Sequence, residues 1–541
     1  MSGLEQQLAS YRSRVETFRW DVPDAFNFGR DVVDRYAADP TRPALLWRDS
    51  AGRERRLGFA DVATASNRFA HLLRSLGVAP GEPVIVMLPR IPEWQIVTVG
   101  ALKAGVLVIP SSTILRPKDI AYRGQHSRAV AVVTSTAQAP AVDAVRGEIA
   151  TLRHFLCWNE QAGPAPDGWT GLRQALEAMP ENDAAGQPTR ASDPALVYYT
   201  SGTTGPPKAV LHDHGYTHTQ RYTTRFWHGA CSGDRLWTTS DTGWAKAAYG
   251  VIFGPWSHGV EVVLYHGRFD PQGELALLSD LNPHVFCAPP TEFRMLVKED
   301  LSGLSAPNLR ECVSAGEPLN PKVIRAWHDA TGLTIRDGYG QTETILLIGN
   351  FVGMPVRPGS MGLPTPGHRV EVIGEDGAPL APGEVGDIAL HGHPPSLFRE
   401  YWQDETATRD CRRGDWYLTG DRAYRDEDGY FWFVGRNDDV IISAGYRIGP
   451  FEVESALVEH PDVVEAAAVA VPHPERGAVV KAFVVLREGV SGDDALVATL
   501  QDHVKTVTAP YKYPRLIEFL DALPKTVSGK IRRLELRERA G

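Results

Sequence analysis

The stretch that organises this 541-residue chain is Thr200-Ser201-Gly202-Thr203-Thr204-Gly205-Pro206-Pro207-Lys208. It follows Ala195-Leu196-Val197-Tyr198-Tyr199, a short apolar and aromatic run that predicts a buried strand. Glycines let backbone N–H groups turn inward, hydroxyls add neutral donors and the lysine adds a positive charge, so the stretch suits a phosphate group. We therefore predict an anion-binding turn directly after a strand.

The known phosphate-binding pattern G-x-x-x-x-G-K-[ST] does not fit this turn. Gly202 and Lys208 have the required separation, but Pro207 stands where the second glycine belongs and Ala209 where the magnesium-binding hydroxyl belongs. Taken alone, the stretch could equally be a polar turn without function.

Length and composition restrict the class of protein. A chain of 541 residues is expected to form two or more domains, and 43% hydrophobic with 23% charged residues is typical of a globular protein. The net charge of −10 argues against nucleic acid as the main partner. Since the five cysteines are scattered and no apolar run reaches the roughly 18–20 residues of a membrane span, we expect a reduced, cytoplasmic location.

Apolar periodicity predicts helices at residues 28–38, 60–76 and 94–102, with buried strands at 84–88, 106–110 and 129–133. After a Pro- and Gly-rich surface connection at 160–193, strands recur at 260–265, 284–288 and 310–314. This alternation predicts layered, mainly parallel α/β sheets.

From about residue 360 the pattern changes to hairpins, which predicts a small β subdomain at about 360–435. A smaller unit follows, with helices at 451–459 and 493–506 and strands at 465–471 and 480–486. We place the domains at 1–435 and 436–541, with a hinge at about 436–439.

Five further stretches stand out because each combines glycine with charged or hydroxyl side chains. They are Asp337-Gly338-Tyr339-Gly340-Gln341-Thr342-Glu343, Tyr417-Leu418-Thr419-Gly420-Asp421, Gly435-Arg436-Asn437-Asp438-Asp439, Ser443-Ala444-Gly445-Tyr446-Arg447-Ile448-Gly449-Pro450 and Leu523-Pro524-Lys525-Thr526-Val527-Ser528-Gly529-Lys530. Each alone reads as a turn. In this order they resemble the successive core motifs of the adenylate-forming (AMP-binding) enzymes, and in detail the medium-chain acyl-CoA synthetase branch.

The resemblance implies a fold and a reaction. The fold is a large N-terminal domain of layered α/β sheets with a small β-barrel subdomain, followed by a small mobile α+β C-terminal domain. The reaction is the ATP-dependent activation of a carboxylic acid, here a medium-chain fatty acid, to an acyl adenylate. Coenzyme A then displaces AMP to give acyl-CoA. ATP, Mg²⁺ and coenzyme A are the implied cofactors and co-substrates.

The resemblance also assigns roles to residues of the nucleotide site. Thr200 to Gly205 with Lys208, Asp337 to Thr342, Asp421, Arg436 and Lys530 would bind ATP or AMP. Within this set, Tyr339 would stack on adenine and Asp421 would accept the ribose hydroxyls. Lys530, Glu343 and Thr200 would be catalytic, with Glu343 as the ligand of Mg²⁺, whose preferred ligands are oxygens.

The same resemblance assigns Ala444, Gly445, Tyr446, Arg476 and Lys505 to coenzyme A and Asp438 to the hinge. The acyl site would include Trp244, Gly340 and Arg447. Ile345 and Ala444 depart from the pattern of the branch, so an aryl or a branched short-chain acid is an alternative substrate.

Three other interpretations stay open at this stage. The enzyme could load the acyl group onto a carrier protein in trans. Alternatively, the chain could be a nucleotide-sensing protein whose site has lost its catalytic activity. His212, His214 and His218 could suggest a metal site, although no carboxylate or thiol stands at ligand spacing. The sequence does not specify the oligomeric state.

Overall fold

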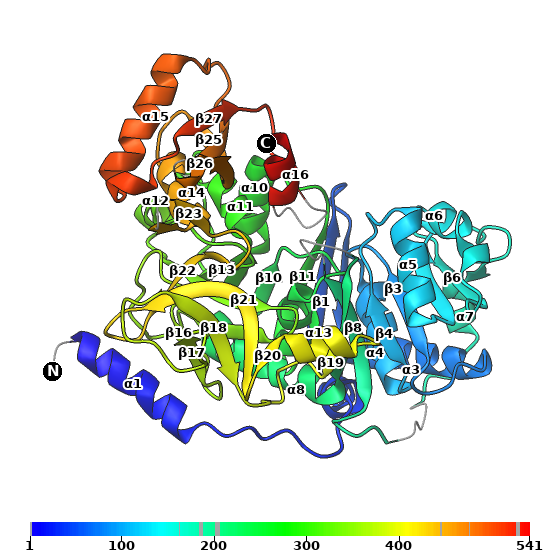
Figure 1. The fold of residues 1–541 in the computed structure, drawn as a ribbon. Helices are drawn as coiled ribbons and strands as arrows, with labels where there is room; N and C mark the ends of the chain where they lie inside the picture. The colour runs from blue at the N-terminus through cyan, green and yellow to red at the C-terminus, as the bar shows by residue number, and fades with distance from the viewer. Residues whose placement is uncertain are drawn as a thin grey trace.

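The computed structural model describes residues 3–161, 163–182, 188–200, 206–443, 446–474, 476–525 and 531–540. Within these ranges two large sheets form the centre of the molecule (Figure 1). The first contains, in spatial order, β16 (Leu363–Pro364), β15 (Ile345–Gly349), β14 (Ile335–Gln341), β13 (Glu311–Ala315), β12 (Val285–Ala288), β10 (Arg235–Thr238), β11 (Glu261–His266), β1 (Pro43–Asp49) and β2 (Glu54–Gly58). Its strands run parallel from β14 to β1, as predicted.

The second sheet carries the strand that precedes the predicted phosphate-binding stretch. Its order is β19 (Glu400–Tyr401), β9 (Lys208–Asp213), β8 (Pro194–Thr200), β4 (Leu107–Pro110), β3 (Pro83–Met87), β5 (Ala131–Ser135), β6 (His154–Trp158) and β7 (Thr170–Gly171). β8 and β9 are neighbouring antiparallel strands, and their ladder pairs Thr200 with Lys208.

Helices fill the space between the sheets and cover their outer faces. Val84 and Val86 of β3 face the central core, whereas Ile85 and Met87 face an outer core, as the period of two in a strand requires. The central layer includes α3 (Phe59–Ser75), α4 (Pro92–Lys103), α7 (Leu172–Glu177), α8 (His214–Thr223) and α9 (Phe253–Trp256). α5 (Pro117–Ser127) and α6 (Ala139–Asp143) cover one outer face, and α10 (Pro271–Leu281), α11 (Pro290–Leu296) and α12 (Pro321–Thr331) cover the other.

The large domain also contains further helical segments, most of them short. The N-terminal one packs beside the first sheet. These segments are α1 (Gly3–Thr17), η1 (Gly29–Asp34), α2 (Arg35–Ala37), η2 (Arg146–Glu148), η3 (Thr224–His228), η4 (Ala248–Ile252) and α13 (Glu405–Asp410). Tyr11 of α1 donates a hydrogen bond to the Pro364 carbonyl at 2.6 Å.

The small β subdomain expected from about residue 360 is an antiparallel half-barrel. It consists of β17 (Val370–Ile373), β18 (Gly386–His391), β20 (Arg412–Arg413), β21 (Trp416–Arg425) and β22 (Phe431–Arg436). It packs against the first sheet, because Leu347 and Ile348 of β15 share a core with Ile388 and Leu390.

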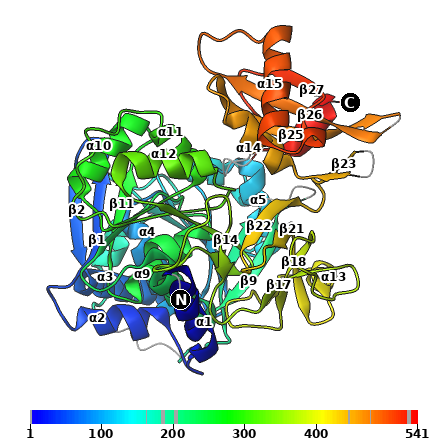
Figure 2. The same ribbon diagram turned by 90° about the vertical axis from the view of Figure 1, so that its left-hand side faces the viewer.

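The C-terminal unit is built around its own sheet and lies at one end of the molecule (Figures 1 and 2). It contains β23 (Ile441–Ser443), β24 (Tyr446–Ile448), β25 (Val463–His473), β26 (Gly477–Leu486), β27 (Leu516–Phe519), α14 (Pro450–Val458), α15 (Asp494–Val507), η5 (Pro510–Lys512) and α16 (Arg533–Ala540). Asn320 donates to the Ser455 hydroxyl at 2.8 Å and Lys322 to the Glu459 carbonyl at 2.9 Å, which joins this unit to the start of α12. The predicted fold class is thereby confirmed.

Three local features differ from the sequence-based expectation. The connection at 160–193 contains the short strand β7 and the helix α7. Asp337 to Gln341 form most of strand β14 rather than a turn, because the neighbouring β13 and β15 pair with them. The helix α1 was not predicted. Across the described ranges, no helix is both long and apolar enough to cross a membrane.

Candidate active site

The predicted nucleotide residues of β14 and β21 meet at one carboxylate. Tyr339 donates its hydroxyl proton to Asp421 Oδ2 at 2.6 Å, and Gln341 Nε2 donates to the same oxygen at 2.9 Å. Gln341 is itself oriented, since Nε2 also donates to the Thr419 carbonyl at 2.8 Å and Oε1 accepts from Tyr417 at 3.0 Å. The orientation of Asp421 is therefore set by two donors from one neighbouring strand, β14.

Arg436 brings positive charge beside this carboxylate. The β21–β22 ladder pairs Asp421 with Arg436 directly, and Arg436 Nε lies 3.4 Å from Asp438 Oδ1. Burial disfavours the charged guanidinium, but the nearby Asp421, Asp438 and Asp439 offset this, so the pKa of Arg436 is raised. The arginine stays protonated at the edge of the nucleotide site.

Glu343 is held by a tyrosine that the sequence analysis did not identify. Tyr401 of β19 donates to Glu343 Oε1 at 2.8 Å, and Phe398 N donates to the Glu343 carbonyl at 2.7 Å. Burial, followed by the charge of Glu343, raises the pKa of Tyr401, so its hydroxyl keeps the donated proton. Lys208 Nζ lies 4.6 Å from the centre of the Tyr401 ring, a cation–π contact that links β9 to this carboxylate.

His212 supports the same segment from β9. Its Nε2 lies 2.7 Å from the Thr342 carbonyl, and its ring stacks on Tyr216 with centroids 3.7 Å apart. Burial lowers the pKa of His212 to about 3, so the neutral ring can donate to that carbonyl. Its neighbours His214 and His218 are buried too, and no cluster of metal-ligating side chains occurs among the described residues.

The structure describes only part of the predicted phosphate-binding stretch. Thr200 lies at the end of β8, where its hydroxyl donates to the Lys208 carbonyl at 3.4 Å. Tyr122 of α5 donates to the Pro207 carbonyl at 3.0 Å and thereby fixes the backbone just before β9. The predictions for Ser201, Gly202, Thr203, Thr204 and Gly205 lie outside the described residues.

Asp337, Gly340 and Ile345 make tight local contacts within β14 and between β14 and β15. Asp337 is buried and its Oδ1 accepts from Gly338 N at 2.9 Å, while burial raises its pKa well above the usual range. At Gly340 a Cβ would lie 1.9 Å from the Ile345 carbonyl oxygen, so the β14–β15 pairing leaves room for glycine only. Ile345 has φ +58°, the left-handed region that a β-branched residue rarely adopts.

Trp244 follows a turn that is anchored at the carboxyl end of β10. Gly243 N donates to Asp241 Oδ1 at 2.8 Å, and a Cβ on Gly243 would lie 2.1 Å from Ser112 N. The turn therefore packs tightly on the segment after β4. Trp244 remains half-buried beside it.

The residues around the predicted hinge form an ionic cluster with the last helix. Arg537 of α16 donates to the Asp438 carbonyl at 3.0 Å and pairs with the Asp439 carboxylate. Arg533 Nη2 donates to Glu454 Oε2 at 3.0 Å, and its Nε lies 3.4 Å from Asp439 Oδ2. Lys530 lies outside the described residues, but the backbones of Lys525 and Ile531 pair on either side of its stretch.

The predicted coenzyme A residues lie in the C-terminal unit. Tyr446 is 54% exposed and stacks on Tyr511 at 4.4 Å, and Lys505 Nζ lies 4.5 Å from the Tyr513 ring. The hairpin of Tyr446 also touches the turn of Arg476, because Ser443 pairs with Gly477. Ala444 and Gly445 lie outside the described residues, and Arg447 is placed only through its backbone pairing with Ile442 in the β23–β24 ladder.

Four supporting residues were missed by the sequence analysis: Tyr401, Tyr417, Thr419 and His212. Tyr417 and Thr419 stand inside a quoted motif, next to Asp421, and their period of two could have suggested that they share its face. Tyr401 reaches Glu343 only because β19 pairs with β9, a contact across about two hundred residues that leaves no local signal.

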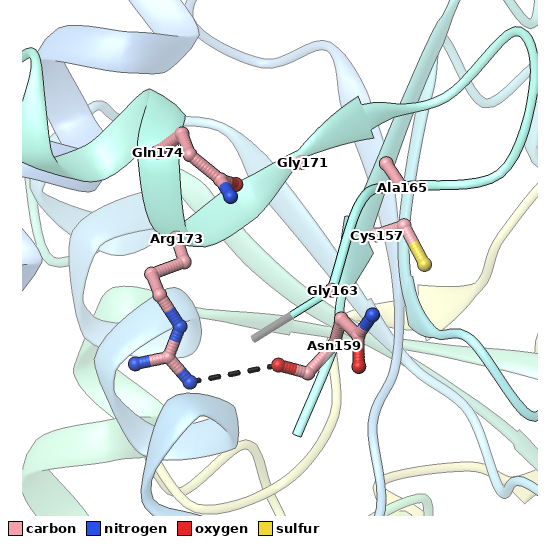
Figure 3. A pocket seen from close by; sticks show the side chains of 7 residues that line it. All are labelled: Cys157, Asn159, Gly163, Ala165, Gly171, Arg173 and Gln174. Atoms are coloured by element: carbon pink, nitrogen blue, oxygen red, sulfur yellow. Dashed lines mark hydrogen bonds between the residues drawn. The ribbon is translucent and has the colours of Figure 1, made fainter. Parts of the chain in front are cut away.

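Two hollows lie away from this constellation. One, near β6 and α7, is bordered by Cys157, Asn159 and Arg173 and leaves no space for a water molecule (Figure 3). The other, about 480 Å³, lies beside α12 at the amino ends of β13 and β14, near Arg310 and Arg336. The site described above lies at the carboxyl ends of the parallel strands, the edge where open α/β sheets bind ligands.

These features define a class of protein, namely proteins in which a large α/β domain carries a smaller C-terminal unit. The AMP-binding enzyme family matches residues 33–402, and the AMP-binding enzyme C-terminal domain matches residues 452–530. The chain therefore belongs to the AMP-binding enzyme family.

Named relatives match over nearly the whole chain. The protein named acyl-coenzyme A synthetase ACSM3, mitochondrial, from Mus musculus is 44% identical over 99% of this chain and 94% of the relative. The Bacillus subtilis protein named uncharacterized acyl-CoA ligase YtcI is 44% identical over 96% of this chain and 97% of the relative. The predicted superfamily is confirmed, and these relatives are named as an acyl-coenzyme A synthetase and an acyl-CoA ligase.

Solved structures give the same result. The anthranilate CoA ligase AuaEII in complex with anthranoyl-AMP superposes with a TM-score of 0.87 at 30% identity, over 96% of this chain and 98% of that one. An acyl-CoA synthetase from Brucella canis superposes with a TM-score of 0.74 at 34% identity, over 99% of this chain and 98% of that one.

Proposed function

We propose that this protein is an AMP-forming acid–CoA ligase. It joins a carboxylic acid to AMP at the expense of ATP, releases diphosphate, and then transfers the acyl group to coenzyme A. The observation that carries the proposal is the joint orientation of Asp421 and Glu343 at the carboxyl ends of the strands. Both family matches and the whole-length relatives support the reaction class.

The chemistry requires two steps because a free carboxylate has no adequate leaving group for a thiol. Attack of the carboxylate oxygen on the α-phosphorus of ATP forms the acyl–phosphate bond and expels diphosphate. The thiolate of coenzyme A then attacks the acyl carbon and expels AMP, while the thiol proton passes to solvent.

For the nucleotide, Asp421 is the group suited to the ribose hydroxyls, because Tyr339 and Gln341 fix its Oδ2. Thr200, Lys208 and the stretch between them would hold the phosphates. Arg436 and Lys530 would stabilise the negative charge that develops in the transfer step. Removal of a preorganised donor of this kind typically costs about 10²–10³ in rate.

The donor set around Glu343 fits a magnesium ion. Mg²⁺ keeps several waters and is usually held by one or two carboxylates together with substrate phosphates, so a single oriented carboxylate suffices. Tyr401 holds Glu343 Oε1 from the protein side. When bound, the ion would neutralise phosphate charge; the residues here orient its ligand.

The C-terminal unit supplies the second set of groups. We propose that it turns about Asp438 between the two steps, which would exchange Lys530 for the segment of Ala444, Gly445 and Tyr446 at the acyl adenylate. Arg476 and Lys505 would contact the nucleotide part of coenzyme A. The domain limits at 435 and 436 belong to this proposal.

We propose a medium-chain fatty acid as the substrate, with Trp244, Gly340 and Arg447 at the acyl site. An aryl acid is the second candidate, because the superposed AuaEII structure is that of an anthranilate CoA ligase. A cytoplasmic location also stays a proposal, since several relatives are named mitochondrial proteins.

The deciding experiment is an acid panel measured by AMP release, from acetate to dodecanoate with benzoate and branched acids. We expect acid-dependent AMP release with coenzyme A and a maximum at a medium chain length. Thioester formed only with a phosphopantetheinylated carrier protein would favour the carrier-loading alternative. No acid-dependent AMP release with any acceptor would refute the ligase.

Two variants separate the steps. Lys530→Ala should block adenylate formation but leave thioester formation from supplied acyl adenylate largely intact. Gly445→Leu should do the reverse, because any Cβ there would narrow the path of the thiol. Equal loss of both steps in Lys530→Ala would refute the rotation about Asp438.

A further inference from the structure

Two buried nitrogen atoms, Lys246 Nζ and His228 Nε2, have no hydrogen-bond partner within the described part of the chain. Thr238 belongs to the same region, and its hydroxyl interacts with the Cys287 thiol. Thr238 is 3% and His228 0% exposed. Buried polar groups in native proteins are almost always paired with protein, water or a ligand, so the unpaired nitrogen atoms of Lys246 and His228 need an explanation.

The three residues belong to one place in the fold. A Cβ on Gly250 would lie 2.5 Å from the Thr238 side chain, so η4 packs directly on the end of β10. Tyr249, the preceding residue, has its ring 6.0 Å from that of His228. Lys246 stands two residues before η4, and its charge helps to lower the pKa of His228, which burial brings to about 3.

The same segment is only partly covered by the rest of the protein. Trp244, Lys246 and Tyr249 keep partial exposure, although Gly243, Ala247, Ala248 and Gly250 around them are buried. Burial nevertheless raises the pKa of Tyr249 well above its usual range.

The ammonium group of Lys246 has no hydrogen-bonded counter-ion in the described ranges. Glu292 is the nearby acid: burial raises its pKa to about 7, against the opposing effect of Lys246 and Arg90, and its carboxylate accepts a hydrogen bond from Thr239. Glu274, the next acid, has a pKa raised to about 8 by burial and by Glu292. Near neutral pH this pair therefore carries less than its full negative charge.

We propose that Lys246, Thr238 and His228 form the polar end of the acyl pocket and that the preferred acid carries an oxygen, as an oxo or hydroxyl group, away from its carboxylate. Lys246 donates to this oxygen, with Thr238 and His228 as further partners. This inference rests on the proposed ligase and specifies its substrate class. A purely hydrocarbon acyl chain would leave Lys246 and His228 unpaired, and a site built for a polar group rejects an analogue that lacks it.

The test compares isosteric acids in which an oxo group replaces a methyl branch. The pairs are 4-oxopentanoate with 4-methylpentanoate, 5-oxohexanoate with 5-methylhexanoate and 6-oxoheptanoate with 6-methylheptanoate. The ratio of kcat/KM within each pair is measured on the full chain by acid-dependent diphosphate release. We expect at least one oxo acid to exceed its methyl partner by about 10- to 100-fold.

Lys246→Met should bring that ratio to about 1 or below, and Thr238→Val should lower it less. Lys118→Met, on the exposed side of α5, is the matched control and should leave the ratio unchanged. Thermal unfolding checks that each variant is folded, and the wild-type ratio tests the idea without any variant. A preference for the methyl acid in every pair, as expected if ordered water satisfies Lys246 and His228, would overturn the inference. An enzyme that is inactive with all acids would instead refute the proposed ligase.

Discussion

The contact between Tyr401 and Glu343 makes a sharp prediction for Tyr401→Phe. The substitution removes one hydroxyl, and with it the 2.8 Å hydrogen bond to Glu343 Oε1. It keeps the ring, and therefore the contacts with Lys208 at 4.6 Å and with Phe398 at 4.8 Å. Any change in rate therefore reports on the orientation of the Glu343 carboxylate.

The size of the effect follows from the burial of the pair. A hydrogen bond to a charged group contributes about 1.5–3 kcal/mol, and about 1.4 kcal/mol corresponds to a tenfold change in rate. Since Glu343 is only 9% exposed, water replaces the lost donor poorly. We expect the adenylation rate to fall by about 10- to 100-fold.

The assay is ATP–diphosphate exchange measured over a series of Mg²⁺ concentrations. Tyr401→Phe should lower the rate and raise the Mg²⁺ concentration needed for half-maximal exchange, while thioester formation from supplied acyl adenylate stays near that of the wild type. Tyr424→Phe is the control, because Tyr424 of β21 stacks on Trp432 of β22 and takes no part in the hydrogen bonds of Glu343 described above. A wild-type exchange rate at limiting Mg²⁺ would refute the assignment of Glu343.

Three further outcomes are expected. Gln341→Leu removes a donor to Asp421 and should raise the KM for ATP about tenfold without affecting that for coenzyme A, as initial rates will test. Gly340→Ala places a Cβ 1.9 Å from the Ile345 carbonyl and should lower the free energy of unfolding by about 1–3 kcal/mol in urea titrations, whereas an unchanged midpoint would contradict the tight β14–β15 pairing. The free energy of unfolding should also fall as the pH drops below about 6.5, because the unfolded chain binds protons at histidines that burial keeps neutral in the folded protein. The loss should reach up to about 1.4 kcal/mol per pH unit for each such histidine. A urea midpoint independent of pH between 7 and 5 would disprove this. The histidines, with pKa values lowered to about 3 or 4, are His212, His214, His218, His228 and His368.

Much of the fold could be predicted because the parallel strands are buried on both faces and therefore appear as continuous apolar runs. The run at 84–88 is the clearest case, with Val84 and Ile85 facing opposite cores. The helix α7 was missed because it is short and stands in a Gly- and Pro-rich region. Asp337 to Gln341 looked like a turn because glycines are rare in strands, but tertiary pairing overrides this preference.

The candidate site was predictable where a motif carries its own chemistry, as at Asp421, Arg436 and Glu343. It was not predictable where the partner comes from a distant strand, as with Tyr401. The polar group around Lys246 was not predicted from the sequence, for a different reason. A single lysine after a tryptophan predicts nothing until the structure shows that its ammonium group is buried and unpaired among the described residues.

The attachment of α16 to the predicted hinge has a thermodynamic consequence. Arg537 holds the Asp438 carbonyl and the Asp439 carboxylate, and α16 begins three residues after Lys530. If Asp438 is the pivot, the segment of Lys530 rotates together with it. A single equilibrium between two orientations of the C-terminal unit then governs both half-reactions. A compound that binds one orientation more tightly must then weaken the other by the same free energy. Inhibition of thioester formation and tighter retention of the adenylate would be one event, measured in two assays.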